Sequence, residues 1–325
     1  MLKYIGKRLL HLIPVMLIIS MVLFGIMELM PGDAVNAYLG VGSGVSVEQQ
    51  AQMREELGLN KNVVVRYGNW LGRTLKGDFG KSILLRAPVR DVMGRSIWNT
   101  FILNFFGMVI AFAISIPVGI KSAVKKYGAY DNFWTVFSLV GVSMPSFFFA
   151  LVLIFFVGIP LGLPLTLMRD PMQAVRGYPS LWAELVDIGR HMIMPLTVLV
   201  ISSLASLTRY VRNSVLEVIN QDYIRTARSK GLSEKVVIYK HAFRNALLPI
   251  VTLLGSYIPS LFGGSLILET IFKWPGIGNR LHEAIFKKDT SLVMAINVFY
   301  ALLMLAGNLL ADISYAFVDP RVKVS

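Results

Sequence analysis

Long runs of apolar residues dominate the chain. A helix needs about 20 mainly apolar residues to cross the hydrocarbon core of a bilayer, because its backbone groups must bond within the segment there. Six stretches qualify, with Asp312 as their one charged residue. They are residues 9–27, 101–120, a tract that starts at Phe133, 192–208, 246–268 and 290–318. The pattern predicts an all-α polytopic membrane protein with six transmembrane helices.

The first and third stretches need separate treatment. The apolar run of the first is longer than the roughly 7 to 15 residues of a signal peptide, and the Pro31-Gly32-Asp33 that follows is no cleavage site, so we expect a retained helix. The third tract has no charged side chain from Phe133 to Met168, which is too long for one straight span. We expect Pro145 to kink this helix and the Pro-Leu-Gly-Leu-Pro segment at 160–164 to end it.

The distribution of basic residues predicts the orientation. With the N-terminus inside, segments 1–8, 121–132, 209–245 and 319–325 hold 16 basic and 5 acidic side chains. The two short outer segments, 161–191 and 269–289, hold 7 basic side chains, and the long outer loop 28–100 carries little weight because long loops cross regardless of charge. We therefore expect both termini in the cytoplasm. A net charge of +13 would also suit a nucleic-acid-binding protein, but here most of it marks the inner side.

Catalytic signatures are missing from the sequence. The chain has no cysteine, which excludes disulfides, thiolate metal sites and cysteine nucleophiles. Gly80-Lys81-Ser82 lacks the earlier glycine of a phosphate-binding loop, and Asp78-Phe79-Gly80 lacks the other kinase motifs. The four histidines lie on separate segments without ligand spacing: His11, His191, His241 and His282. We expect no enzymatic activity and no bound cofactor or metal, so any ATP is bound by another subunit.

The outer loop 28–100 is long enough to form a small extracellular helical domain. Its patterns predict helices at 45–59, 69–75 and 88–97, with a glycine turn at 77–80. Two interpretations stay open: a docking platform for an extracellular partner, or a cap over the helix bundle. The organisation expected is therefore residues 1–27 for the tail and first span, 28–100 for the outer domain, and 101–325 for the permeation core.

The inner segment from Arg209 to Asn245, here named the 209–245 loop, is predicted to form two helices. The first continues out of the fourth span, and spacings of three and four residues give it one apolar stripe at Leu216, Ile219, Tyr223 and Ala227. Gly231 is able to take the positive φ that stops a helix.

Ser233 then caps the second helix, with Glu234 in its first turn, and this helix runs on to Pro249. Basic side chains occupy the other faces: Arg225, Arg228, Lys230, Lys235, Lys240 and Arg244. Such a short helix makes a rigid knob that suits a groove on a soluble protein, or a basic loop that rests on anionic lipid.

The 209–245 loop resembles the EAA loop of ABC importer permeases, in the form of the oligopeptide and dipeptide branch. The resemblance lies in Asp222 to Leu232, which read DYIRTARSKGL, and in the NALLP of 245–249; the family's Glu-Ala-Ala appears as Arg225-Thr226-Ala227. Further matching segments span almost the whole chain: MPGD at 30–33, GDFGKS at 77–82, SMPSF at 143–147, Glu269 with WPGIG at 274–278, and DPR at 319–321.

The resemblance implies the type I importer permease fold and half of a peptide-conducting pore in a bacterial or archaeal plasma membrane. The implied partners are a second homologous permease subunit, usually a different chain, two cytoplasmic ATPases that hold ATP and Mg²⁺, and an extracellular or periplasmic binding protein. The residues implied to couple the pore to an ATPase are Asp222, Tyr223, Arg225, Thr226, Ala227, Arg228, Gly231 and Leu232.

Alternatives remain at the level of solute and class. The same branch contains permeases for nickel and other small solutes, and a channel or secondary transporter would need no ATPase. Neither internal repeats nor mid-span charges favour the latter, since Asp312 lies near the inner end of its span. Polar residues that either line a wet pathway or bond helix to helix are Asn104, Ser202, Ser203, Ser206, Ser256, Tyr257, Ser260, Asn297 and Asn308. The Gly263-Gly264 pair suits close packing or a gate.

Overall fold

The structure is a computed structural model that describes residues 2–29, 48, 52, 55 and 60–318. Within these ranges the chain is helical, and extended backbone pairs only at one bridge between Lys81 and Pro88. The chain divides into two compact units. Unit 1 comprises Met1–Thr100, Phe262–Leu266 and Pro275–Ser325, and unit 2 comprises Phe101–Leu261 and Ile267–Trp274.

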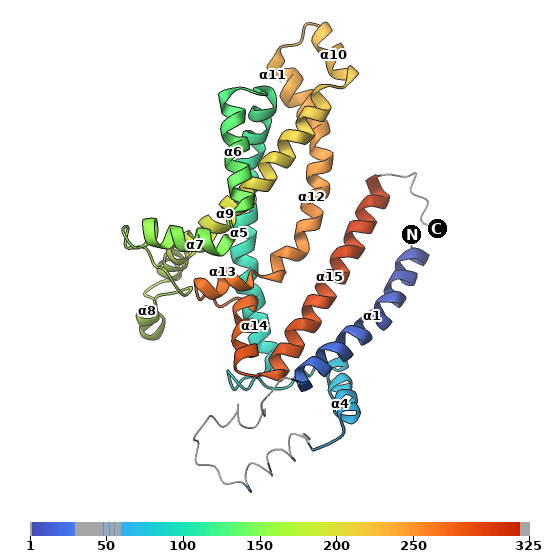
Figure 1. Cartoon of the computed structure of the whole chain (residues 1–325), viewed down its shortest axis with the longest axis vertical. Coiled ribbons are helices and arrows are strands. Elements are labelled where there is room, and N and C mark those ends of the chain that lie inside the picture. The colour runs from blue at the N-terminus through green and yellow to red at the C-terminus, as the bar shows by residue number, and fades with distance from the viewer. Residues whose placement is uncertain (1, 30–47, 49–51, 53–54, 56–59, 319–325) are drawn as a thin grey trace. The chain divides into compact units, whose positions relative to one another are not determined.

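Unit 1 is built around the last helix of the chain. Its helices are α1 (Leu2–Leu29), α4 (Val63–Leu75), the beginning of α5 (Val89–Val124), α14 (Ile277–Phe286) and α15 (Thr290–Val318) (Figure 1). Both α1 and α14 pack against α15, and α4 packs against α1. Buried aliphatic side chains from α5, α14 and α15 form its core, including Val89, Val92, Ile277, Leu292 and Ile296.

A buried carboxylate fixes the start of α15. Asp289 accepts hydrogen bonds from Ser82 Oγ at 2.5 Å, from the Leu84 amide at 3.0 Å and from the Leu292 amide at 3.1 Å. Its side chain is fully buried. The carboxylate thus caps α15 and holds the segment that precedes α5. These residues, 82–84 with 289–292, are called the Asp289 corner below.

The described part of the outer loop confirms one predicted helix and corrects another. The helix predicted at 69–75 is present as α4, which starts earlier because the Asn62 side chain accepts from the Val64 amide at 3.0 Å. The helix predicted at 88–97 is not separate but forms the first turns of α5. Of the predicted helix at 45–59, most lies outside the described residues, and Glu48, Gln52 and Glu55 are helical.

The continuity of α5 has a specific cause. The polar residues Asn99 and Thr100 interrupt the apolar pattern, yet their side chains are satisfied without ending the helix. Asn99 Nδ2 donates to the Pro275 carbonyl at 3.0 Å, and the Thr100 hydroxyl accepts from the Ile277 amide at 2.8 Å. Hydrogen bonds to the start of α14 therefore replace the solvent contacts that a helix boundary would need.

Unit 2 is arranged around the long helix α9. Its elements are the rest of α5, α6 (Ala129–Ser143), α7 (Ser146–Leu153), η1 (Ile154–Gly158), α8 (Pro171–Arg176), α9 (Leu181–Ile219), α10 (Asp222–Ser229), α11 (Glu234–Val236), η2 (Val237–Ala242), α12 (Phe243–Gly263) and α13 (Leu266–Ile271). Helices α6 and α7 both pack against α9. A Cβ atom on Gly119 or Gly141 would lie only 2.7 or 2.8 Å from a side-chain carbon of α9. The backbones of α5 and α6 thus approach α9 closely, as small residues allow in membrane proteins.

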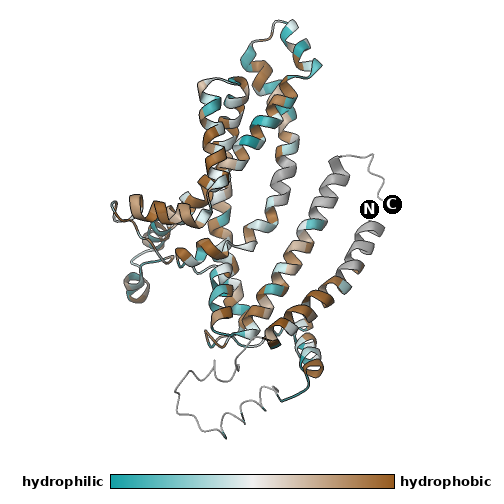
Figure 2. Ribbon diagram, viewed as in Figure 1, coloured by the Kyte–Doolittle hydropathy of each residue, from teal (hydrophilic) through white to brown (hydrophobic). Residues whose placement is uncertain are grey.

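The third apolar tract bends more sharply than a kinked span. Met144 and Pro145 are both extended, and the helices on either side of them differ in direction by 106°. The expected kink at Pro145 is thus a complete break, because the residue before a proline is driven out of the helical region. The helical part of the tract ends at Gly158, just before the predicted stop at 160–164. Figure 2 shows α7 as strongly apolar, and exposed phenylalanines lie on both elements, with Phe148 on α7 and Phe155 and Phe156 on η1.

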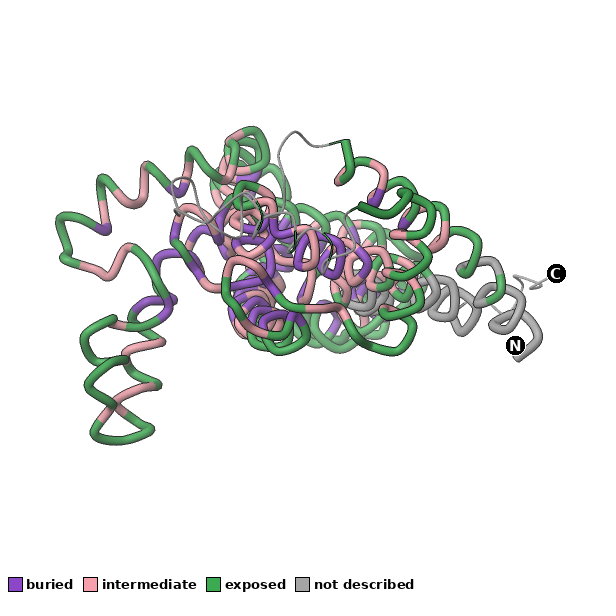
Figure 3. Tube along the Cα trace, turned by 90° about the horizontal axis from the view of Figure 1, so that it is seen from below, coloured by how far each residue is buried: buried purple, intermediate pink, exposed green. Residues whose placement is uncertain are grey.

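The other predicted spans are found as helices with one further break. Residues 9–27, 101–120 and 192–208 lie within α1, α5 and α9, and the last predicted span coincides with α15. The fifth is interrupted, because α12 ends at Gly263, Gly264 has φ of +67°, and α13 follows. By length and composition, three of the described helices are able to cross a bilayer, or four when the bent pair is counted as one span. Many of their apolar positions are exposed (green in Figure 3).

Candidate functional site

The 209–245 loop folds into two short helices over a small apolar core. Helix α10 contributes Ile224 and Ala227, and the following turns contribute Val237 and Ala242. All four side chains are buried, and they pack against the last turn of α9. The loop therefore has a defined shape of its own.

The first helix of the loop does not continue α9, as the sequence pattern predicted. Helix α9 ends at Ile219, Gln221 is extended, and α10 begins anew at Asp222. The break resets the helical phase, so Ile224 takes the buried position and Tyr223, which belonged to the predicted stripe, is exposed. The predicted stripe is thus wrong at Tyr223 and correct at Ala227.

Gly231 ends the first helix as predicted. Its φ is +74°, and its amide donates to the Arg228 carbonyl at 2.9 Å. Ser233 is the N-cap residue of α11, as predicted, but its side chain makes no capping hydrogen bond. The Ser233 carbonyl instead accepts from the amides of Val236 and Val237 at 2.9 and 3.0 Å.

A π-helical turn follows α11. Element η2 spans Val237–Ala242 and continues directly into α12. In an α-helix two residues five apart point about 140° away from each other, whereas the wider π turn, with bonds between residues i and i+5, brings them near one face. Val237 and Ala242 are such a pair, and both cover the core side of α10.

The outer surface of the loop is charged. Arg228 and Glu234 join the two helices through an ion pair, with Arg228 NH2 2.7 Å from Glu234 Oε1. The hydrogen bond from Arg228 holds the pKa of the Glu234 carboxyl below its usual value. Arg225 lies 3.6 Å from Asp222, an exposed pair that adds little to stability. The basic side chains at Lys230, Lys235, Lys240 and Arg244 are exposed as well.

The eight residues implied to couple the pore to an ATPase lie together on α10 and in the turn after it. Ala227 is buried and supports the loop from inside. The other seven are exposed: Asp222, Tyr223, Arg225, Thr226, Arg228, Gly231 and Leu232. This exposed set is mainly polar and charged, with Tyr223 and Leu232 as its apolar members.

Family models match nearly the whole chain. The binding-protein-dependent transport system inner membrane component matches residues 115–324, and its N-terminal counterpart matches residues 1–104. The chain belongs to this family of transport permeases. It is therefore a membrane component of a transport system.

Relatives of this permease span its full length. It is 40% identical to the "Oligopeptide transport system permease protein AppB" of Bacillus subtilis, over 99% of this chain and 100% of the relative. It is 36% identical to the "Dipeptide transport system permease protein DppB" of Escherichia coli K12, with 99% of both chains covered. A chain of the inward-facing MetNI methionine ABC transporter is 18% identical, with a TM-score of 0.48, over 69% of this chain and 96% of that one.

Several of the polar residues singled out in the spans of the permease bond to backbone carbonyls. Asn104 Nδ2 of α5 donates to the carbonyls of Ser260 and Leu261 in α12, at 3.1 and 3.2 Å. Ser206 and Asn297 bond to carbonyls of their own helices. These contacts favour a helix-packing role. Asn308 is exposed, Ser202 and Ser203 are half-buried, and the side chain of Ser256 lies outside the described set.

Two polar clusters in the permease escaped sequence reasoning. Asp131 of α6 is buried and receives two hydrogen bonds from Arg212 of α9, at 2.6 and 2.8 Å. In the 161–191 segment, Asp187 accepts from Tyr178 Oη at 2.6 Å and lies 3.3 Å from His191 Nδ1. A lone acid in a basic inner segment was a usable signal for the first pair, whereas the second has no sequence pattern. Among the described residues, no group of three potential ligands is placed to hold a metal ion.

Proposed function

We propose that this chain is the permease subunit of an ATP-driven, binding-protein-dependent importer of peptides, and that it forms half of the translocation pore. Membership of the family gives the transport system, and the names of the full-length oligopeptide and dipeptide relatives support peptides as the solute. The chain itself carries out no ATP hydrolysis. ATP and Mg²⁺ are bound by two separate cytoplasmic ATPase subunits.

The observation that carries the proposal is the construction of the 209–245 loop. A buried core of four small and aliphatic side chains fixes its shape, while its exposed surface is charged. Such a rigid projection transmits a displacement, because its own contacts do not yield when a partner pushes on it. Each chain has one such loop, which fits one ATPase for each permease and a second, related permease as the other half of the pore.

The proposed topology has six spans and cytoplasmic termini. The spans are α1, α5, α6 with α7, α9, α12 with α13, and α15. The 209–245 loop then lies in the cytoplasm with the other inner segments, which together carry a net charge of +11. Residues 28–100 form the extracellular domain, and the exposed valines at 63–65 of α4 support its use as a docking surface for the binding protein.

Charge reversal on the loop surface tests this assignment. Asp222 and Arg225 are largely exposed, so Asp222→Arg with Arg225→Glu keeps the fold of the loop and changes what a partner meets. In proteoliposomes that contain the complete transporter, we expect the double variant to lose peptide uptake and the stimulation of ATP hydrolysis by a peptide-loaded binding protein. Arg176→Glu, an exposed charge reversal in α8, is the matched control and leaves both activities unchanged.

A second variant acts through the backbone. Gly231→Pro demands a φ near −65° where the native value is +74°, so the turn between α10 and α11 has to be rebuilt. We expect uncoupled ATP hydrolysis in a protein that still inserts into the membrane. Normal peptide uptake in both Gly231→Pro and the charge-reversal variant would contradict the role of the loop. The solute is identified in a separate experiment, in which the binding protein is loaded with a panel of peptides and the stimulation of ATP hydrolysis is measured.

A further inference from the structure

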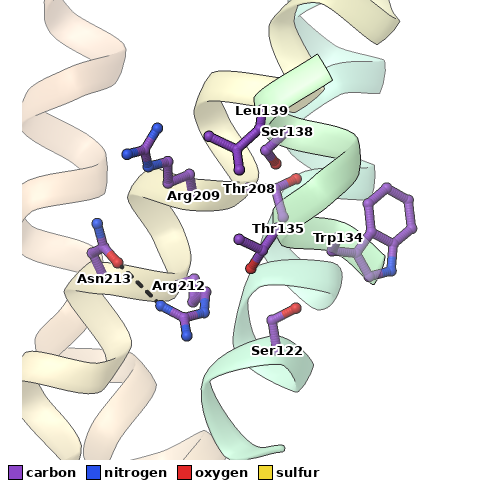
Figure 4. A pocket seen from close by; sticks show the side chains of 9 residues that line it. All are labelled: Ser122, Trp134, Thr135, Ser138, Leu139, Thr208, Arg209, Arg212 and Asn213. Atoms are coloured by element: carbon purple, nitrogen blue, oxygen red, sulfur yellow. Dashed lines mark hydrogen bonds between the residues drawn. The ribbon is translucent and has the colours of Figure 1, made fainter. Parts of the chain in front are cut away.

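A cavity of about 200 Å³ lies within unit 2, between α5, α6 and α9. Its walls include Ser122, Trp134, Ser138, Thr208, Arg209 and Arg212, which Figure 4 shows around one hollow. The volume exceeds the roughly 30 Å³ that one water molecule occupies in the liquid, so a group of several heavy atoms fits. The cavity lies where α5 approaches its end at Val124 and where the 209–245 loop begins.

Two hydroxyl groups in these walls have no hydrogen-bond partner. The side chains of Ser122 and Thr208 are almost completely buried, and neither hydroxyl oxygen has a partner within the structure. A buried polar group without a partner is costly and is rare in native proteins. Each hydroxyl rotates and is able to donate one hydrogen bond, so together they suit a ligand that presents acceptor oxygens.

The charge of the cavity is positive. The two oxygens of Asp131 are occupied by Arg212, and the Tyr127 amide donates to one of them at 2.9 Å. Arg209 is exposed at the rim, and no carboxylate of the described residues pairs with it. One arginine charge therefore remains uncompensated, and a planar guanidinium is well suited to a phosphate oxygen.

The outward side of the cavity is apolar. Leu139 lines it and is half exposed, and Phe133 and Val136 of the same helix are also exposed. The Trp134 ring makes edge-to-face contacts with Phe133 and Phe137 on α6, and tryptophan is typical of the membrane interface. A free phosphate ion makes no use of such a surface, whereas a lipid places its acyl chains there.

We propose that this cavity binds the phosphate of an anionic glycerophospholipid headgroup. Arg209 pairs with the phosphate, the hydroxyls of Ser122 and Thr208 donate to its oxygens, and the apolar face of α6 carries the acyl chains. Basic pockets between helices at the cytoplasmic surface are known to bind such headgroups. The inference rests on the membrane location of the chain and is independent of the transported solute.

Native mass spectrometry of the purified full-length chain tests the site. Phosphatidylglycerol and phosphatidylcholine with identical acyl chains are titrated separately, and inorganic phosphate is titrated in a third series. We expect phosphatidylglycerol to bind more tightly than phosphatidylcholine. The Ser122→Ala and Arg209→Ala double variant removes two hydrogen bonds to the charged phosphate, so it is expected to weaken phosphatidylglycerol binding about a hundredfold. Arg244→Ala removes an exposed charge from the same loop outside the cavity and leaves the affinity unchanged.

A thermal measurement separates binding from a merely structural role. Thr208→Val removes an unpaired hydroxyl at nearly constant volume, so it keeps or raises the melting temperature without lipid while it reduces the increase that phosphatidylglycerol causes. Equal affinity for the two lipids, or an unchanged preference in the Ser122→Ala and Arg209→Ala double variant, overturns the proposal. If inorganic phosphate binds at the same residues and phosphatidylglycerol binds no more tightly than phosphatidylcholine, the ligand is free phosphate and not a lipid headgroup.

Discussion

The 209–245 loop and the Asp289 corner place their charged groups in opposite ways. In the loop, the core is small and apolar, and the charged groups lie on the surface, where Arg228 and Glu234 pair in contact with water. In the corner, the charged group itself is buried, and Asp289 takes hydrogen bonds from three donors. Charges that recognise a partner protein have to stay exposed to solvent, whereas the charge of a fixed connection between segments is buried and hydrogen-bonded within the chain. The two regions therefore differ in which substitutions each tolerates.

The largest effect is expected in the corner. Asp289→Ala leaves the Ser82 hydroxyl and two amides without their acceptor, at a cost of about 3 kcal/mol in the free energy of unfolding. Thermal unfolding in detergent measures this as a melting temperature lowered by several degrees. Asp91→Ala, an exposed aspartate in the first turn of α5, is the control, and an equal loss in both variants contradicts the special role of Asp289.

A charge buried in the loop is expected to act locally. Ala227→Asp places a carboxylate without a partner in the core of the loop, so α10 detaches while the corner is unaffected. Hydrogen exchange is expected to lose protection in residues 222–242 alone. The neighbouring exposed variant Thr226→Asp adds the same charge and keeps protection. Loss of protection at residues 289–296 as well would mean that the two regions are not independent.

The turn at Gly231 gives a smaller effect of known origin. A Cβ atom at this position meets no atom within 4 Å, so only the backbone conformation opposes substitution. Gly231→Ala is expected to cost about 1–2 kcal/mol, and Gly231→Asn less, because asparagine tolerates a positive φ. The free energy of local opening, measured by hydrogen exchange, gives the order of these two costs. Identical costs for alanine and asparagine would exclude the backbone explanation.

The smallest effect is the pH dependence of the surface ion pair. Because Arg228 lowers the pKa of Glu234 below its unfolded value of 4.5, the pair stabilises the loop above about pH 4.5. This contribution is lost as the pH falls through the folded pKa, and exposure limits it to less than about 1 kcal/mol. Exchange protection of α10, corrected for intrinsic rates, is expected to decline there. Glu234→Gln removes this decline, and a decline that persists in the variant has another source.

Local signals made much of the fold predictable. The bounds of α15 follow from one apolar run in which Asp312 is the single charged residue, and the positive φ of Gly231 follows from a glycine placed after a short amphipathic segment. The misassigned position of Tyr223 has a physical reason: the pattern on both sides of Asn220 is helical, so periodicity does not reveal that the phase resets there. The break at Met144 and Pro145 is likewise sharper than the kink expected from the sequence.

Contacts between distant residues were beyond sequence reasoning. Asp131 and Arg212 are 81 positions apart, and Ser82 and Asp289 are 207 positions apart. The lone acid among the basic residues of 121–132 indicates a partner for Asp131, but the local pattern identifies neither that partner nor the burial of the charges, because both depend on how the helices pack. The unpaired hydroxyls of Ser122 and Thr208 belong to the same class, since they read as ordinary small residues within apolar helices.

The π turn at 237–242 has a consequence for insertions and deletions. A turn of this kind holds one residue more than an α-helical turn, so deletion of one residue within it allows the segment to wind as a regular α-helix. Val237 and Ala242, then four positions apart, still lie near one face, so the segment ahead of the turn keeps its phase relative to α12. The width of the turn thus absorbs one surplus residue, and a deletion there is expected to keep the direction of α10, whereas the same deletion within the regular part of α12 turns the tip by about 100°.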